Sequence, residues 1–131
     1  MTQPPSPADG YVGGEVQIGG GFGGMKPLAQ HGTVAIAQGV LTLYDTNGGV
    51  IDSAPLTGVE VSRIKMTMGQ SVYAVLNGKK YSLSVGHGQR MHAADLVLGG
   101  GLVGGLGQMA DAKAGTAGFI AAFEALSGKT V

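Results

Sequence analysis

Few residues of this chain have the types and spacing that chemistry requires. His87, His92 and Asp95 come closest to a ligand cluster, because imidazole and carboxylate groups are common protein ligands of transition metals. On a helix, His92 and Asp95 would share a face, whereas His87 lies five positions before His92, at a poor angle for the same ion. His31 is distant from these three residues in the sequence, so only the tertiary fold can bring it close to them. The spacing therefore favours solvated or structural histidines, with metal binding as the alternative.

Nucleophilic, acid–base and phosphate-binding motifs are also weak. No serine or threonine lies in a Gly-x-Ser-x-Gly elbow, and the carboxylates are too scattered to nominate an acid–base pair. Gly19–Gly24 and Gly99–Gly104 match Gly-x-Gly-x-x-Gly, but that fingerprint binds dinucleotides only between a strand and a helix of a parallel βαβ unit. Gly128–Thr130 resembles the end of a phosphate-binding loop, yet Phe123 stands where the first glycine belongs. We therefore expect no enzyme activity, cofactor or metal.

Composition narrows the class of partner. The 131 residues include 26 glycines, roughly three times the usual share, and no cysteine. Charged residues make up 12% and the formal net charge is zero, which disfavours binding to a phosphate backbone and leaves little self-repulsion against association. The lack of cysteine excludes a disulfide scaffold, and Met1–Pro7 has no basic and apolar stretch of a secretory signal. We expect a cytoplasmic protein with protein partners and no nucleic acid.

The elements that would position any site begin with a block of short strands between Thr33 and Val85. Apolar and polar residues alternate there with a period of two, which is typical of strands that bury one face. The predicted strands are Thr33–Ala37, Val40–Tyr44, Val50–Ala54, Val59–Met68, Ser71–Leu76 and Lys79–Val85. Residues 1–30 are predicted to be a flexible leader rich in proline and glycine, with one short alternating piece at Glu15–Ile18. Residues 31–131 are predicted to form a single β-rich domain.

One turn signal determines how the last two predicted strands pair with each other. Asn77-Gly78 is the strongest short hairpin signal, because both central residues of a type I′ turn need a positive φ. A two-residue loop there places Ala74 opposite Tyr81 and Val72 opposite Leu83. These four residues are the predicted core face of the hairpin.

The length of the preceding connection sets the register of the next strand pair. A three-residue loop, Met68–Gln70, is preferred because it places Ile64 opposite Ala74 and keeps Lys65 off the buried face. The same register implies a bulge near Ser62-Arg63. Thr46–Gly49 is predicted to close the earlier hairpin.

A helix is predicted over residues 118–127. Its apolar stripe consists of Phe119, Ile120, Phe123 and Leu126. Thr116 is suited to cap its start and Gly128 to end it in the left-handed conformation. The helix is expected to cover the apolar face of the strand block.

Meander strand order, the segment Pro-Leu-x-x-Val-Glu-Val from Pro55 to Val61, and the closing helix from Phe119 to Leu126 together resemble small bacterial pleckstrin-homology-like domains. The resemblance covers Thr33–Val85 and Gly118–Ser127, and it implies two antiparallel sheets plugged by a C-terminal helix. Six strands are evident where that fold has seven, so Glu15–Ile18 or a split of Val59–Met68 must supply another. Some such domains bind phosphoinositides through basic residues of the first hairpin. Gln38-Gly39 lacks any, so this role is not carried over.

The segment 86–115 is the least usual. Six of the nine residues from Gly99 to Gly107 are glycine, which as an exposed helix would cost roughly 5–6 kcal/mol relative to alanine. Three interpretations are open: small-xxx-small packing that brings two backbones together, peripheral membrane or lipid contact, and a flexible loop. Packing is preferred. The candidate interaction residues are Leu96, Gly100, Gly101, Leu102, Val103, Gly104, Gly105, Leu106 and Met109.

Taken together, the sequence predicts an α+β domain, a bent antiparallel sheet or small β-barrel closed by a C-terminal helix, with a glycine-rich insertion before that helix. Its predicted function is a non-enzymatic binding or assembly module that uses the Gly/Leu-rich segment for self-association or docking. The alternative is a small-ligand or lipid-binding protein with an apolar cavity between sheet and helix. We interpret the basic residues of the adjacent hairpins as a solvated face, with a patch for an anionic partner as the alternative; they are Arg63, Lys65, Lys79 and Lys80.

Overall fold

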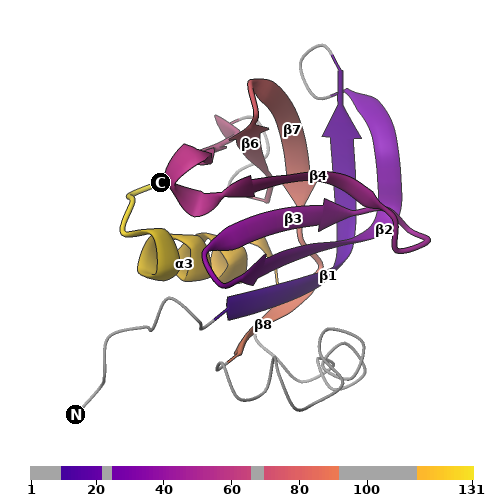
Figure 1. Cartoon of the computed structure of the whole chain (residues 1–131). Coiled ribbons are helices and arrows are strands. Elements are labelled where there is room, and N and C mark those ends of the chain that lie inside the picture. Colours follow the sequence, from indigo (N-terminus) through magenta and orange to yellow (C-terminus); the bar gives the residue numbers. More distant parts are fainter. Residues whose placement is uncertain (1–9, 22–24, 66–69, 92–114) are drawn as a thin grey trace.

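The computed structural model describes residues 10–21, 25–65, 70–91 and 115–131, and these form one curled antiparallel sheet with a helix packed against it (Figure 1). The elements are β1 (Gly10–Gly20), β2 (Lys26–Ala37), β3 (Val40–Tyr44), β4 (Val50–Pro55), the 3-10 turn η2 (Leu56–Gly58), β5 (Glu60–Arg63), β6 (Val72–Leu76), β7 (Lys79–Ser84), β8 (His87–Met91) and the helix α3 (Thr116–Ser127).

The strands follow the spatial order β4-β3-β2-β1-β7-β6-β5, and β8 also pairs with β1. The sheet thus has two ends, β4 and β5, and it does not close into a barrel over the described strands. The α+β class, with an antiparallel sheet and a C-terminal helix, is confirmed. Of the two predicted forms of the sheet, the structure has the bent open sheet and not the closed barrel.

Strand β1 lies in the middle of the sheet, although residues 1–30 were expected to be a leader. One edge of β1 pairs with β2, while the other pairs with β7 through Gln17–Gly19 and with β8 through Gly10–Gly14. Two residues on each side separate these paired stretches, so β7 and β8 act as one partner strand that kinks at Val85-Gly86 without a register shift. The short piece Glu15–Ile18 is therefore part of an eleven-residue strand.

The hairpin between β6 and β7 confirms the predicted register. Ala74 pairs with Tyr81 and Val72 with Leu83, and all four side chains are buried. Asn77 has a positive φ of 52°, as the turn type requires.

The predicted pairing of β5 with β6 is wrong by three residues. Val61 pairs with Ala74, where Ile64 was expected. The backbone N–H of Ile64 donates to the carbonyl of Ser71, so the connection between the two strands is longer than a three-residue turn. The bulge expected near Ser62-Arg63 is also wrong, because Glu60–Arg63 pair with β6 without a register shift.

Helix α3 packs against β1 and β8 and contributes side chains to the hydrophobic core. Of the predicted stripe, Phe119, Ile120 and Phe123 are buried and Leu126 is partly buried. The Phe119 ring lies 5.8 Å from the Tyr11 ring, centroid to centroid. Gly128 ends the helix with a φ of 76°, in the left-handed conformation. No helix in the described part of the chain has the length and apolar character needed to cross a bilayer.

The start of α3 differs from the prediction. Gly115 occupies the N-cap position, and Thr116 is the first helical residue. The buried Thr116 hydroxyl accepts a hydrogen bond from the Val85 N–H at 3.1 Å and donates one to the Gln70 carbonyl at 2.7 Å. Thr116 therefore joins the helix to the kink between β7 and β8, which leaves no hydroxyl for capping.

Candidate functional site

A bulge on β1 marks the place where the central strand changes partner. Between the pairs Gly13–Val34 and Val16–Gly32, β1 holds one residue more than β2. Glu15, in this bulge, has a φ of 50°, a left-handed conformation that non-glycine residues adopt at a cost of about 1–3 kcal/mol. Bulges of this kind redirect a side chain and are frequent beside functional sites.

A second bulge lies directly after it, on β2. Between the pairs Val16–Gly32 and Ile18–Ala29, β2 now holds the extra residue. The two opposed bulges bring Glu15 and His31 together, with Oε2 and Nδ1 2.6 Å apart. Both side chains are mostly exposed, so the pair contributes little to stability. Its importance lies in the placement of a carboxylate beside an imidazole.

The turn between β3 and β4 lies beside the Glu15–His31 pair and lines the same hollow in the surface. The backbone N–H of His31 donates to the Thr46 hydroxyl at 3.3 Å, which ties this turn to the bulge on β2. The Asp45 carboxylate accepts hydrogen bonds from the N–H groups of Asn47 (2.9 Å) and Gly49 (2.8 Å), both at Oδ1. Asp45 is therefore held in place by its own turn.

His87, the first residue of β8, also lines this hollow. It pairs with Gly14, and a Cβ atom on that glycine would lie 2.7 Å from the imidazole Cε1, so the ring rests on the bare backbone of Gly14. The Nδ1 atom of His87 is buried and has no hydrogen-bond partner among the described residues. Because this atom has almost no exposed surface and lies against Gly14, it is not an acceptor for a ligand in the solvent-filled space beside it.

The hollow that these residues line has a volume of about 340 Å³, and we call it the bulge pocket. Its lining residues are Gly14, Glu15, His31, Gly32, Thr33, Asp45, Thr46, Gly48 and His87. The lining includes two carboxylates and two imidazoles, and it includes no lysine or arginine. Within the described ranges, no three His, Cys, Asp or Glu residues are grouped so as to hold a metal ion.

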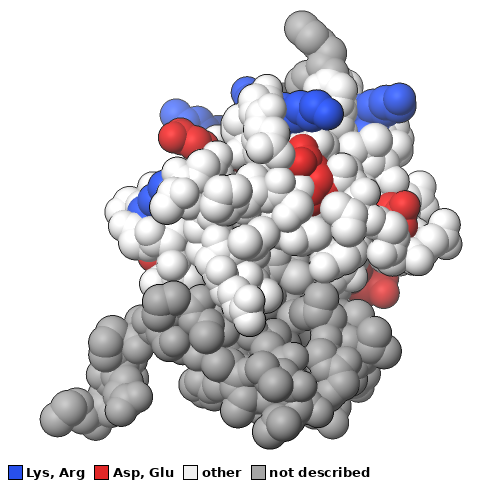
Figure 2. All heavy atoms as spheres, viewed as in Figure 1, with Lys and Arg blue, Asp and Glu red and all other residues white. Residues whose placement is uncertain are grey.

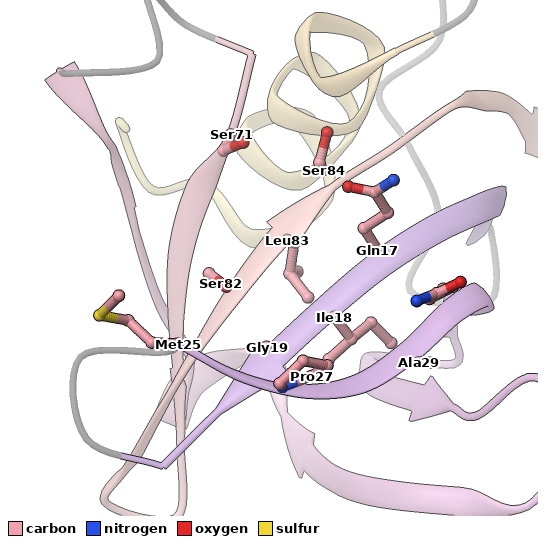
Figure 3. Close-up of a pocket in the computed structure, with 11 residues that line it drawn as sticks. Gln17, Ile18, Gly19, Met25, Pro27, Ala29, Ser71, Ser82, Leu83 and Ser84 are labelled. Atoms are coloured by element: carbon pink, nitrogen blue, oxygen red, sulfur yellow. The ribbon is translucent and has the colours of Figure 1, made fainter.

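A second hollow, of about 320 Å³, lies over β1 and β7 (Figure 3). No ionisable side chain lines it. Small polar side chains, Ser71, Ser82 and Ser84, face it together with Gln17, and the side chain of Met25, which is 83% exposed, stands at its rim. Neither hollow is lined by a residue of α3, so neither is the apolar cavity between sheet and helix that the ligand-binding alternative predicted.

The residues that the sequence singled out are only partly brought together. His31 and His87 meet in the bulge pocket, while His92 and Asp95 lie outside the described residues. The interaction residues from Leu96 to Met109 also lie outside them. The carboxylates of the pocket were not foreseen: the turn at Thr46–Gly49 was predicted, but the two bulges that bring Glu15 and His31 to it have no signal in the sequence beyond Gly13-Gly14 before Glu15.

The four basic residues of the adjacent hairpins do not form one cluster. Arg63 is level with Val72, at the opposite end of β6 from Lys79, and its guanidinium donates to the carbonyl of Val131 at 3.3 Å. Lys80 lies over the Tyr73 ring, with Nζ 4.5 Å from the centroid. Figure 2 shows basic side chains mainly along the upper rim of one face, with acidic side chains among and below them.

Two of the motifs that resemble nucleotide-binding sequences include described residues, and neither has the structure that nucleotide binding requires. Gly19 lies in an antiparallel strand and pairs with Pro27, which is not the strand-to-helix turn that a dinucleotide needs. Gly128 serves as the end of α3. Comparison with protein-family models, with curated proteins and with solved structures finds no match to this chain.

Proposed function

We propose that this protein is a non-enzymatic binding or assembly module, and that residues 96–109 form its contact surface through self-association or docking to a larger complex. The pattern that motivates this is the pair of small-xxx-small repeats, Gly100 to Gly104 and Gly101 to Gly105, with Leu102 and Leu106 to pack around them. The proposal includes a cytoplasmic location, and a protein partner in preference to nucleic acid.

One observation carries the proposal: the described fold holds both ends of the segment that contains these repeats. On one side, Met91 pairs with Gly10 at the end of the central strand. On the other, the Thr116 hydroxyl is bonded to Val85 and Gln70. A contact segment held at both ends loses less entropy on binding than a free tail does, which favours its use as an interface.

The pleckstrin-homology-like relationship belongs to the same proposal. It is supported by a strongly curled antiparallel sheet and a C-terminal helix whose Phe119 and Phe123 enter the core. Domains of that kind are usually binding or assembly modules.

Light scattering coupled to size exclusion tests the proposal on the full chain, without and with a mild detergent. We expect a discrete oligomer without detergent. Gly101→Leu and Gly104→Leu should each weaken it about tenfold or more, because overpacking a close contact costs about 1–3 kcal/mol. The far-ultraviolet circular dichroism of the dissociated variants should match that of the wild type.

Gly58→Leu is the matched control. A Cβ atom at Gly58 meets nothing within 4 Å, so the added side chain should leave the oligomer intact. A monomeric wild type that binds detergent would replace the assembly function by lipid or membrane contact. A monomer indifferent to detergent would refute self-association.

A further inference from the structure

We propose that the bulge pocket is a binding site for an organic cation, a primary ammonium or a guanidinium group. The inference rests on residues other than those of the proposed assembly surface, so either can fail without the other.

The first argument is charge. Glu15 and Asp45 line the pocket, and no lysine or arginine does. His31 can neutralise Glu15 only when its imidazole carries a proton, and one carboxylate remains uncompensated even then. A concave surface with an excess of negative charge concentrates cations.

The second argument is a surplus of hydrogen-bond acceptors. Both hydrogen bonds that the Asp45 side chain receives from its turn end at Oδ1, and the contact between Glu15 and His31 uses Oε2. An ammonium group carries three donors and a guanidinium five, and hydrogen bonds between such donors and carboxylates are among the strongest in proteins.

The third argument is that the pocket is built by backbone features. Glu15 holds a φ of 50° within its bulge, a conformation whose cost must be met by the surrounding fold. Thr46 anchors the β3–β4 turn to the backbone of His31, and that turn fixes Asp45. The two carboxylates are therefore positioned before a ligand arrives, which lowers the entropic cost of binding.

Size and ligand number favour an organic cation over a metal ion. A pocket of about 340 Å³ lies at the lower end of the range for small-molecule sites, and it has room for one short cationic chain. A transition metal needs three or four converging ligands, and the described residues hold no such group.

The test uses the full chain and three probes of similar shape. n-Butylammonium and n-butylguanidinium carry the proposed charge, and N-butylurea is a neutral analogue of the guanidinium. Two-dimensional 1H–15N spectra should show saturable shifts, centred on Glu15, His31 and Thr46, with one or both cations and none with the urea. Equal shifts with N-butylurea, or no saturable shift with either cation, would overturn the proposal.

Variants locate the binding. Glu15→Gln and Asp45→Asn keep the side-chain shape and should each weaken cation binding about tenfold, the effect of losing one charge-assisted hydrogen bond. Glu60→Gln, at an exposed position on β5, should leave binding unchanged. If Asp45→Asn disturbs its turn and fails to fold, Glu15→Gln decides. Unchanged binding in that variant would refute the site.

One further titration identifies the source of the cation, and another distinguishes an organic cation from a metal ion. An arginine tripeptide that binds about tenfold tighter than n-butylguanidinium would identify a protein side chain as the ligand, and equal affinity would identify a free small molecule. Saturable Zn²⁺ binding that shifts the imidazole signals of both His31 and His87, without any response to the organic cations, would replace the proposal by a metal site.

Discussion

The Tyr81 hydroxyl on β7 donates a 2.7 Å hydrogen bond to the Asp52 carboxylate on β4, although no backbone hydrogen-bond ladder joins these two strands. Asn77, in the β6–β7 turn, adds hydrogen bonds to the Asp52 carboxylate (2.8 Å) and to the Ser53 carbonyl (2.9 Å). Side chains therefore join the edge strand β4 to the other half of the sheet. This contact also occupies part of an edge that would otherwise be free to pair with another chain.

Tyr81→Phe should lower the free energy of unfolding by about 1–2 kcal/mol, because it removes one hydrogen bond to a charged group and leaves the ring in the core. Urea unfolding followed by circular dichroism measures the change. Tyr73→Phe, on the outer face of β6, is the matched control and should change stability by less than about 0.5 kcal/mol. Equal losses in the two variants would show that the link to β4 does not stabilise the sheet.

The same contact makes stability depend on pH. Burial raises the pKa of Asp52, but hydrogen bonds from Tyr81, Ser53 and Asn77 and the charge of Lys79 outweigh burial, and the pKa lies below its ordinary 3.8. A carboxylate with a depressed pKa stabilises the fold above its unfolded pKa, and this stabilisation is lost as the pH falls through the folded pKa. The urea midpoint of the wild type should therefore fall below about pH 4 more steeply than that of Asp52→Asn. Parallel curves would contradict the assignment.

At high pH, the ionisation of Tyr81, the partner of Asp52, should lower the stability of the protein. Burial, followed by the hydrogen bond to Asp52 and its charge, raises the pKa of Tyr81 from 10.0 to about 12. A raised pKa gives stability that is complete below the unfolded value and is lost as the pH rises through the folded value. Stability should fall between pH 10 and about 12, and Tyr81→Phe should reduce the slope. An unchanged slope in the variant would assign the fall to other groups.

A second tyrosine should behave in the opposite way. The Tyr11 hydroxyl is buried without a hydrogen-bond partner among the described residues, and burial raises its pKa well above the ordinary value. Tyr11→Phe removes an unpaired polar atom, so it should leave stability unchanged or raise it by up to about 1 kcal/mol. A loss as large as that of Tyr81→Phe, measured by the same urea unfolding, would show that the hydroxyl has a partner.

Thr116→Val should destabilise the protein by about 1–3 kcal/mol, because it leaves the Val85 N–H unpaired and removes the shorter of the two hydroxyl hydrogen bonds to the Gln70 carbonyl, which keeps the one from Ser84. Thr116→Ser keeps the hydroxyl and should recover most of this loss. Thermal unfolding of the two variants makes the comparison. A serine variant as unstable as the valine one would assign the effect to the methyl group.

The sequence predicted those parts of the fold whose side chains display a pattern. Asn77-Gly78 determined the β6–β7 register, and the stripe from Phe119 to Leu126 located α3. Strand β1 was missed beyond Glu15–Ile18 because five of its eleven residues are glycine, and a residue without a side chain shows no alternation. Aromatic rings cover two of these glycines: the Tyr11 ring lies over Gly13 and the His87 ring over Gly14, where a Cβ atom would approach within 3.0 Å or less.

The bulge pocket was harder to foresee. Its two histidines are 56 positions apart in sequence, and only the pairing of β1 with both β2 and β8 brings them together. Glu15 and His31 meet because two bulges on neighbouring strands compensate each other, which depends on tertiary packing. The register of β5 failed for a related reason, since the length of the connection after it had no turn signal to fix it.

Hydrogen–deuterium exchange followed by mass spectrometry tests the proposed assembly function most directly. The full chain and its Gly101→Leu variant would be compared at a concentration where the wild type is associated. The proposal predicts slower exchange of peptides within residues 96–109 in the wild type than in the variant, with unchanged exchange of the sheet and α3. Identical exchange of that segment in the two proteins would contradict it.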